Sequence, residues 1–385
     1  MKFVRNIIDK VKPPFQKGNK LGFLHSTFEA FESFAFVPNT TSKSGTHIHD
    51  SIDLKRTMTV VIIALMPALL FGIWNVGFLH AHTCGVDMGF WEMCWYGILR
   101  VFPIILVSYA VGLGIEFAAA QLRGHEVNEG FLVTGMLIPL IMPIGVPLWM
   151  VALATAFAVI IGKEIFGGTG MNIFNPALLA RAFVFFSYPS HISGDKVWIS
   201  GISNQPAIDA ASGATPLAHA AAGEMDKLPS IFDMFFGFIP GSIGETSTLA
   251  ILLGAVILIY TGIGSWKIML SCVVGALGVG FLLNLTAANS YMELPAYYHL
   301  LLGGFAFGAV FMATDPVTGT QTEIGKWIYG FLIGALAVLI RVFNAGYAEG
   351  MMLAILFMNA FAPLIDHYVV QANIRRRMKR TKLQN

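Results

Sequence analysis

The chain has 385 residues, of which 56% are hydrophobic and only 12% are charged, and its mean hydropathy is +0.69. Soluble domains carry about 25% charged residues, so this composition excludes an ordinary soluble protein and predicts one embedded in a lipid bilayer. The net charge of +2 leaves the class of partner open, and no nucleic-acid-binding pattern is present beyond a basic C-terminal tail.

Residues 1–54 predict a cytoplasmic N-terminal segment with a basic character. Its charges, and the break at Pro13 and Pro14, exclude a cleavable signal peptide, so we expect the first spanning helix to direct membrane insertion. It contains an aromatic cluster of Phe23, Phe28, Phe31, Phe34 and Phe36. Within it, the spacing of Phe28, Phe31 and Phe34, with the neighbouring Ala30, favours one face of a short helix that lies on the membrane or on a partner.

Ten apolar segments follow this lead. Several are shorter than the roughly 20 residues that a straight membrane span needs, and prolines interrupt the short ones. Broken segments of this kind are typical of half-helices that meet at a buried site. The predicted segments are 56–78, 97–120, 130–144, 147–164, 174–188, 247–264, 267–286, 298–313, 326–342 and 350–366.

Positive charge is distributed unevenly between the predicted loops. With ten spans, almost all lysines and arginines of the loops fall on the side of the two termini, so the positive-inside rule places both termini in the cytoplasm. Arg341, near the outer end of the ninth span, is an exception. The pattern predicts an all-α polytopic membrane protein with about ten transmembrane helices.

The long polar stretch at 189–246 divides the spans into two groups of five, at 55–188 and 247–366. An odd number of spans in each half gives the halves opposite orientations, as in inverted-repeat transporters. The 189–246 loop then lies outside the cytoplasm, and 367–385 forms a basic cytoplasmic tail.

The densest polar cluster at membrane depth runs from Gly162 to Pro176. Asn172 and Asn175 bring amides that both donate and accept hydrogen bonds, and a flat heterocycle with imide edges would satisfy them. The alternative is an N-cap followed by a glycine-rich turn. It is not a phosphate loop, because the GxxxxGK[ST] pattern is absent from it.

Three carboxylates lie in or at the ends of apolar segments. Glu116 lies in the second span, Asp315 at the end of the eighth, and Asp366 at the end of the tenth. Intramembrane carboxylates are candidates for ion or proton routes, and Glu116 is the deepest. Asp366 could instead cap a helix at the interface.

Other polar groups give weaker signals. His80, His82 and Cys84, with Cys94 ten residues on, carry metal-ligand atoms, but a disulfide or plain loop residues explain them better. Three cysteines are too few for an iron–sulfur cluster within this chain. The turn at 125–130 favours helix capping over binding, and no Ser–His–Asp or Cys–His nucleophile arrangement is present.

Ser212, Gly213, Ala214 and Thr215 form a small-residue tetrapeptide within the 189–246 loop. Two hydroxyls and an easily approached backbone define it, and its plain interpretation is a flexible turn. Chemistry at this site therefore depends on what surrounds it.

Several long strings resemble the family of B subunits of the sodium-translocating NADH:quinone oxidoreductase. The D subunit of the Rnf complex represents a related family, but the long N-terminal lead favours the first. The strings are HDSIDLKR at 49–56, HEVNEGF at 125–131, KEIFGGTGMNIFNPAL at 163–178, SGD at 193–195, PGSIGETSTLA at 240–250, GGFAFGAVFMATDPV at 303–317 and EGMMLAILFMNAFAPLIDH at 349–367.

The resemblance implies a covalent FMN, joined to Thr215 by a phosphoester bond. A dedicated flavin transferase outside the cytoplasm, which uses FAD, would install it within the Ser212–Thr215 motif. A threonine hydroxyl suits attack on a phosphoryl group. The predicted side of the loop agrees with this chemistry.

The resemblance also implies a non-covalent riboflavin at Asn172 and Asn175 and a quinone region near the second span. There Gly112, Leu113 and Gly114 stand where the family carries adjacent glycines. Further implications are a fold like that of urea transporters, a bacterial inner membrane location and a six-subunit complex. That complex would relay electrons through flavins to quinone and export sodium.

The partner subunits would bring the sites for NADH, FAD and iron–sulfur clusters, because this chain lacks a dinucleotide fingerprint. A passive channel or secondary transporter is the alternative function, since broken helices and inverted halves suit it too. Covalent flavin distinguishes the two classes of protein.

Overall fold

The computed structural model describes residues 54–123, 130–201, 213–344 and 349–382, together with short stretches of the lead at 8, 10–15, 19, 22, 28, 32, 42, 44–46 and 48. Most of the predicted aromatic helix in the lead, the turn at 125–129 and Ser212 lie outside the described residues. Of the lead's aromatic cluster, Phe28 is described, and its ring stacks on that of Phe15 at 4.9 Å.

Helices make up all the regular structure in the described part of the chain. Five of them are long and apolar enough to cross a membrane: α3 (Leu54–Cys84), α4 (Phe90–Arg123), α11 (Trp266–Thr286), α15 (Glu323–Phe343) and α16 (Met351–Lys382). The prediction of an all-α polytopic membrane protein is confirmed.

The remaining apolar segments are short or broken helices, as the prolines predicted. Two of them include π-helical turns, which are rare and frequently occur at functional sites. They are α5 (Phe131–Leu140), α6 (Leu148–Val159) with the π-helical η3 (Ile160–Glu164), α7 (Pro176–Ser187), α10 (Thr248–Tyr260), α13 (Tyr298–Leu301), and α14 (Phe305–Phe307) with the π-helical η7 (Gly308–Met312).

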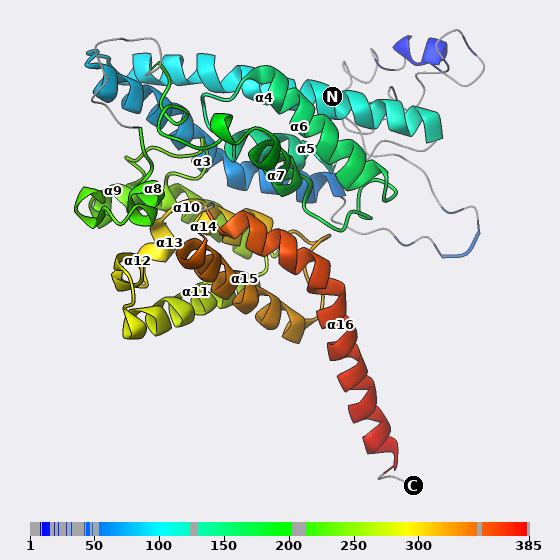
Figure 1. Cartoon of the computed structure of the whole chain (residues 1–385). Helices are drawn as coiled ribbons and strands as arrows, with labels where there is room; N and C mark the ends of the chain where they lie inside the picture. Colours follow the sequence, from blue (N-terminus) through cyan, green and yellow to red (C-terminus); the bar gives the residue numbers. More distant parts are fainter. Residues whose placement is uncertain are drawn as a thin grey trace.

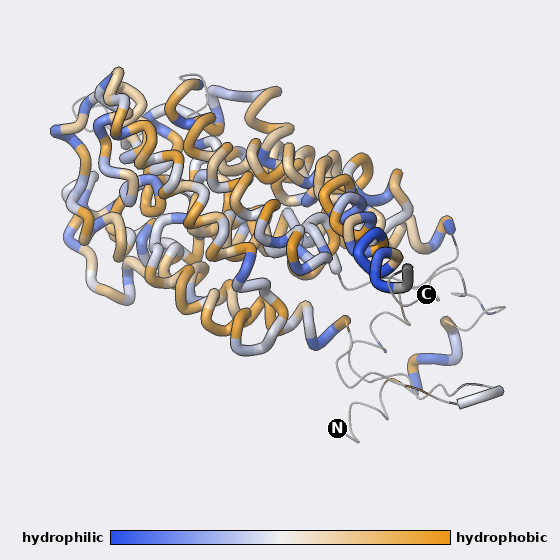
Figure 2. Tube along the Cα trace, turned by 90° about the horizontal axis from the view of Figure 1, so that it is seen from below, coloured by the Kyte–Doolittle hydropathy of each residue, from blue (hydrophilic) through white to orange (hydrophobic). Residues whose placement is uncertain are grey.

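The helices form two groups that follow the order of the chain (Figure 1). Helices α3–α7 lie together on one side, α10–α16 lie on the other, and α3 packs against α10 between them. Hydrophobic stretches, coloured orange in Figure 2, run through the helices of both groups, whereas the end of α16 is hydrophilic. One continuous core of buried apolar side chains extends through both groups.

Some predicted boundaries are wrong. Helix α3 continues to Cys84 and α4 begins at Phe90, so His80, His82 and Cys84 lie on a helix and not in a loop. Helix α16 continues without a break from Met351 through the expected tail to Lys382. Helical hydrogen bonding does not end where the sequence turns polar, so hydropathy alone misplaces such ends.

Arg341 departs from the positive-inside pattern because it is a buried structural residue. Its guanidinium donates to the backbone oxygens of Glu349 at 3.0 Å, His299 at 2.6 Å and Leu302 at 2.8 Å. Only 1% of the residue is exposed. The guanidinium therefore holds the end of α13 against the start of α16.

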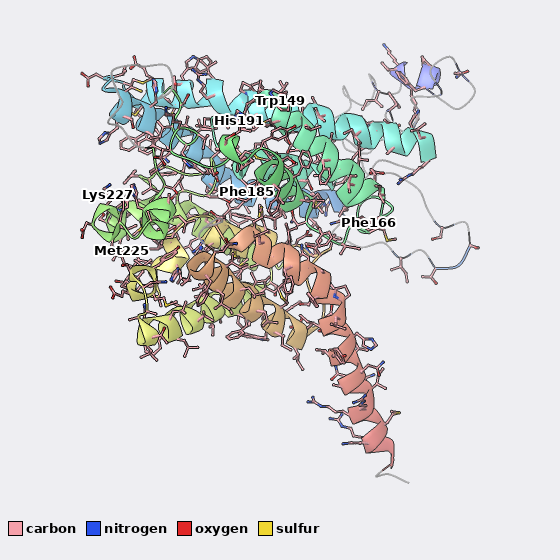
Figure 3. The ribbon with its side chains drawn as sticks, viewed as in Figure 1. Trp149, Phe166, Phe185, His191, Met225 and Lys227 are labelled. Atoms are coloured by element: carbon pink, nitrogen blue, oxygen red, sulfur yellow. The ribbon has the colours of Figure 1, made fainter. Side chains whose placement is uncertain are left out.

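The described part of the 189–246 loop, residues 189–201 and 213–246, contains four short helices. They are η4 (Pro189–His191), α8 (Pro216–Ala221), η6 (Met225–Lys227) and α9 (Ile231–Phe236). Figure 3 shows Met225 and Lys227 at the edge of the molecule beside α8 and α9. Glu224 accepts from His219 at 2.8 Å and from Lys227 at 2.9 Å, and these contacts hold the pKa of this exposed carboxyl below its usual range.

Candidate functional site

Thr215 is the N-cap of α8. Its Oγ1 accepts a hydrogen bond from the backbone N–H of Ala218 at 3.2 Å, and Pro216 follows at the first helical position. A capping hydroxyl with proline after it is a favoured helix start. The cap gives the Thr215 hydroxyl a defined direction at the start of α8.

Gly213 lets two segments of the loop approach each other closely. A Cβ at Gly213 would lie 2.3 Å from the backbone oxygen of Asp195, a distance that real side chains do not tolerate. The Thr215 motif therefore packs against the 193–195 turn, which the sequence singled out separately.

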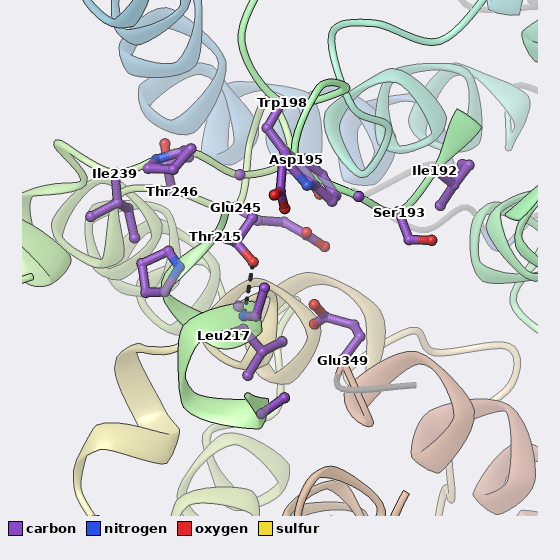
Figure 4. A pocket seen from close by; sticks show the side chains of 18 of the residues that line it. Ile192, Ser193, Asp195, Trp198, Thr215, Leu217, Ile239, Glu245, Thr246 and Glu349 are labelled. Carbon is purple, nitrogen blue, oxygen red and sulfur yellow. Dashed lines mark hydrogen bonds between the residues drawn. The ribbon is translucent and has the colours of Figure 1, made fainter. Parts of the chain in front are cut away.

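Thr215 lines a cavity of about 480 Å³ between α7, α8 and the turn that precedes α10 (Figure 4). This volume lies in the range of about 300–1,000 Å³ that is usual for small-molecule sites. The cavity is called the Thr215 cavity below. Its lining includes Arg181, Phe185, Trp198, Ser242, Glu245, Thr246 and Glu349.

A buried ion pair that sequence reasoning missed borders this cavity. Nη1 of Arg181 in α7 donates to Oε1 of Glu245 at 2.8 Å and to Oε2 at 2.9 Å, and both side chains are buried. Glu349 accepts from the backbone N–H of Gly304 at 2.8 Å. Arg181 lies in the apolar 174–188 segment, and an ionisable residue in such a segment indicates a buried partner, so the sequence did contain a signal for this ion pair.

A second cavity, of about 100 Å³, brings together residues that the sequence treated separately. Asn172, Asn175, Lys163 and Asp315 all line it, and it is called the Asn175 cavity below. An adjacent cavity of about 340 Å³ shares Asp315 with it. The two polar motifs of the two groups of helices thus meet at one place.

Asn175 caps α7, as the alternative interpretation predicted. Its Oδ1 accepts from the backbone N–H groups of Ala177 at 3.0 Å and Leu178 at 3.3 Å. Its Nδ2 donates to Oδ2 of Asp315 at 3.3 Å and so bridges the two groups of helices. The capping interpretation and the binding interpretation are compatible, because the capping side chain still borders the cavity.

Asn172 makes fewer hydrogen bonds to described residues than Asn175 does. Its Nδ2 donates to the backbone oxygen of Phe174 at 3.1 Å. Its amide oxygen has no partner among the described residues, although the residue is buried and lines the cavity.

Glu116 is paired rather than isolated. Lys163 in η3 donates a hydrogen bond to it, and both side chains are buried. The next residue, Glu164, accepts from Arg123 at 3.0 Å. Lys163 also lines the Asn175 cavity, so Glu116 is connected to that cavity through the lysine.

The two glycines of the predicted quinone region differ in their surroundings. A Cβ at Gly112 would lie 1.8 Å from Cζ of Phe131, whereas a Cβ at Gly114 would meet nothing within 4 Å. Gly112 therefore faces a packed aromatic ring inside the protein, and Gly114 faces open space.

Asp366 holds the turn before α15. Its Oδ1 accepts from Oγ1 of Thr322 at 2.5 Å and from the Thr322 N–H at 3.1 Å, and its Oδ2 accepts from the Gln321 N–H at 2.8 Å. This is the capping role that the sequence offered as the alternative for this carboxylate.

The histidines at the end of α3 belong to a structural contact. The ring of His80 stacks on Tyr96 at 4.2 Å, and its Nδ1 lies 2.7 Å from the backbone oxygen of Ser200. Cys84 and Cys94 are free thiols. Within the described residues, no group of three or more metal-ligand side chains could hold a metal ion.

Two residues that line cavities have a buried hydroxyl without a partner among the described residues. They are Thr246, which lines the Thr215 cavity, and Thr320, which lines the cavity adjacent to the Asn175 cavity. Buried polar groups normally have partners, so such atoms indicate positions where a ligand can bind. The Thr215 cavity has room for a flavin ring, whereas the Asn175 cavity, at about 100 Å³, is too small for one by itself.

Comparisons with known proteins agree over almost the whole chain. The sequence profile of the NQR2, RnfD, RnfE family matches residues 41–375. A relative from Chromohalobacter salexigens, named as the B subunit of Na(+)-translocating NADH-quinone reductase, is 47% identical, and the match covers 98% of this chain and 96% of the relative. Relatives of the same name from Ectopseudomonas mendocina and Azotobacter vinelandii are 45% and 44% identical, and each match covers 98% of this chain and 99% of the relative.

Proposed function

The chain belongs to the NQR2, RnfD, RnfE family, and from this premise we propose that it carries a covalent FMN on Thr215 and relays electrons to quinone. Its identity of 44–47% to the relatives named above, over 98% of this chain, makes it a membrane subunit of a Na⁺-translocating NADH:quinone reductase. The resemblance read from the sequence motifs is thereby confirmed.

The observation that carries the FMN proposal is the position of the Thr215 hydroxyl. It lies at the border of a cavity large enough for a flavin ring, and the α8 cap holds its direction. An FAD-dependent transferase outside the cytoplasm would catalyse the attachment, in which Oγ1 forms the phosphoester bond to the FMN phosphate, the pyrophosphate bond of FAD breaks, AMP leaves and the hydroxyl proton is released. FMN supplies one-electron transfer when bound, and this chain's residues bind the ring and tune its potential.

Riboflavin is the second cofactor of the proposal, bound without a covalent link where Asn172, Asn175 and Asp315 meet. Amides that donate and accept match the imide edge of that ring. Asn175 would orient the ring from its position as the cap of α7, and Asn172 would offer its amide oxygen, which has no partner among the described residues.

Sodium export completes the proposed activity. Glu116 and Asp315 are the proposed carboxylates of the sodium route, because one is joined to the Asn175 cavity through Lys163 and the other lines it. Asp366 belongs to the same proposal, although its three hydrogen bonds favour an anchoring role. The other subunits of the complex and quinone are the proposed partners, in a bacterial inner membrane with both termini in the cytoplasm.

Covalent attachment is tested by expressing the chain with and without a flavin transferase and viewing a denaturing gel under ultraviolet light. We expect a fluorescent band only with the transferase, a dark band for Thr215→Ala, and a fluorescent band for the control Thr155→Ala, because Thr155 lies in α6 and does not line the Thr215 cavity. Thr215→Ser keeps the hydroxyl and is expected to retain flavin. A dark parent band or a bright Thr215→Ala band would refute the proposal.

A further inference from the structure

The Thr215 cavity has an aromatic wall and a polar end. Trp198, half-buried, and Phe185 of α7 border it, whereas Arg181, Glu245 and Thr246 bring polar atoms to it. Trp198 and Glu245 approach Thr215 from the same side of α8 in Figure 4. A ligand held at Thr215 therefore meets both an apolar surface and a set of hydrogen-bonding groups.

The polar end contains an atom without a partner. Oγ1 of Thr246 is buried and makes no hydrogen bond to any described residue, although only 5% of the residue is exposed. Leaving a buried hydroxyl unpaired costs about 1–3 kcal/mol. A ligand group that pairs with it would recover that free energy.

We propose that the ring of the flavin attached to Thr215 lies against the indole of Trp198, with its pyrimidine edge on Arg181, Glu245 and Thr246. The proposal rests on the attachment proposed above. That edge presents a carbonyl acceptor, an N–H donor and a second carbonyl acceptor. A guanidinium donates, a carboxylate accepts and a hydroxyl donates, so the three side chains offer the kinds of hydrogen bond that this edge requires.

The Arg181–Glu245 pair gives this arrangement an electrostatic consequence. Reduction adds negative charge to the pyrimidine end of a flavin, and a nearby guanidinium stabilises that charge. Nη1 of Arg181 donates to both carboxylate oxygens of Glu245, and these two hydrogen bonds hold the guanidinium in place. These residues would then set the potential of the flavin rather than its attachment.

Trp198→Phe tests the contact with the ring. Indole in contact with a flavin quenches its emission by electron transfer, and phenylalanine does so far less. With the full chain expressed beside a transferase, and Thr215→Ala as the blank, we expect emission per covalent flavin to rise several-fold in Trp198→Phe. Trp149→Phe is the matched control, because Trp149 is 54% exposed and lies outside the cavity.

Thr246→Val tests the edge and removes the hydroxyl at almost constant volume. Without flavin, the variant is expected to melt at the parent's temperature or above it, because the hydroxyl makes no hydrogen bond to a described residue. With covalent flavin, the rise in melting temperature that attachment gives is expected to be smaller than in the parent. Thr155→Val is the control, since Oγ1 of Thr155 is also buried and unpartnered but lies in α6 away from the cavity.

The outcomes separate this inference from the function on which it rests. A parent band that is dark on the denaturing gel would refute the attachment itself. Full attachment with unchanged emission in Trp198→Phe would refute the contact with Trp198. Full attachment with an unchanged melting shift in Thr246→Val would refute the placement of the pyrimidine edge.

Discussion

Lys163 donates a hydrogen bond to Glu116 across the contact between η3 and α4, and both side chains are buried. The sequence marked Glu116 as the deepest of three carboxylates in or beside the spans and gave no partner for it. The lysine balances its charge and joins it to the Asn175 cavity. Any ion role for Glu116 therefore involves Lys163 as well.

Glu116→Gln is expected to destabilise the protein, because it leaves the Lys163 ammonium buried without its carboxylate. Removing one partner of a buried pair costs about 3–5 kcal/mol. Thermal unfolding in detergent measures this loss. Glu116→Gln with Lys163→Gln is the control, and we expect it to recover most of the stability.

The same variant tests the proposed sodium route. We expect the sodium dependence of quinone reduction to weaken in Glu116→Gln while covalent flavin stays at the parent's level, because Thr215 lies in the other cavity. Sodium dependence that matches the parent's, in protein that is still folded, would count against an ion role for this carboxylate.

Gly112→Ala and Gly114→Ala form a matched pair in one helix turn of α4. The new Cβ at position 112 would overlap the Phe131 ring, and overpacking of this kind costs about 1–3 kcal/mol. The new Cβ at position 114 meets open space, so that variant is expected to be neutral or more stable by up to about 1 kcal/mol. Melting temperatures measure both effects.

Quinone kinetics extend this comparison to the proposed quinone region. Phe131 lies between Gly112 and Lys163, whose Nζ is 5.9 Å from the ring centroid. A displaced ring is expected to raise the KM for quinone in Gly112→Ala and leave it unchanged in Gly114→Ala. Equal KM values in both variants would argue against a quinone site beside Gly112.

The sequence predicted the helices better than their contacts. Apolar segments and prolines located almost every spanning or broken helix, because those signals are local. The pairing of Arg181 with Glu245, 64 residues apart, depends on how α7 packs against the turn before α10. Local patterns carry no such information.

In the candidate sites, too, the sequence showed local features and not the contacts between distant residues. The proposed cofactor of Thr215 came only from the family resemblance, although Pro216 after Thr215 is the same local signal for a helix start as Pro176 after Asn175. Asn175 was recognisable as a cap from the proline that follows it. Its hydrogen bond to Asp315 was not, because those residues belong to different groups of helices.

Asp366→Ala tests whether this carboxylate is an anchor or part of an ion route. The change leaves two backbone N–H groups and the Thr322 hydroxyl without their acceptor, and we expect a loss of about 1–3 kcal/mol. For an anchor, the sodium concentration that gives half-maximal activity remains that of the parent. A marked rise in that concentration, at a parent-like melting temperature, would instead assign Asp366 to the ion route.

Asn172→Ala and Asn175→Ala are expected to separate riboflavin binding from helix capping. Asn175→Ala removes two capping hydrogen bonds and the bond to Asp315, so it is expected to lower stability by about 0.5–2 kcal/mol as well as reduce bound riboflavin. Asn172→Ala removes a single bond to Phe174, so the riboflavin-free protein is expected to melt near the parent's temperature. Its riboflavin content, measured by chromatography after acid release, is nevertheless expected to fall several-fold. If Asn172→Ala retains as much riboflavin as the parent, the Asn172 amide does not bind riboflavin, and the proposed site is wrong at this residue.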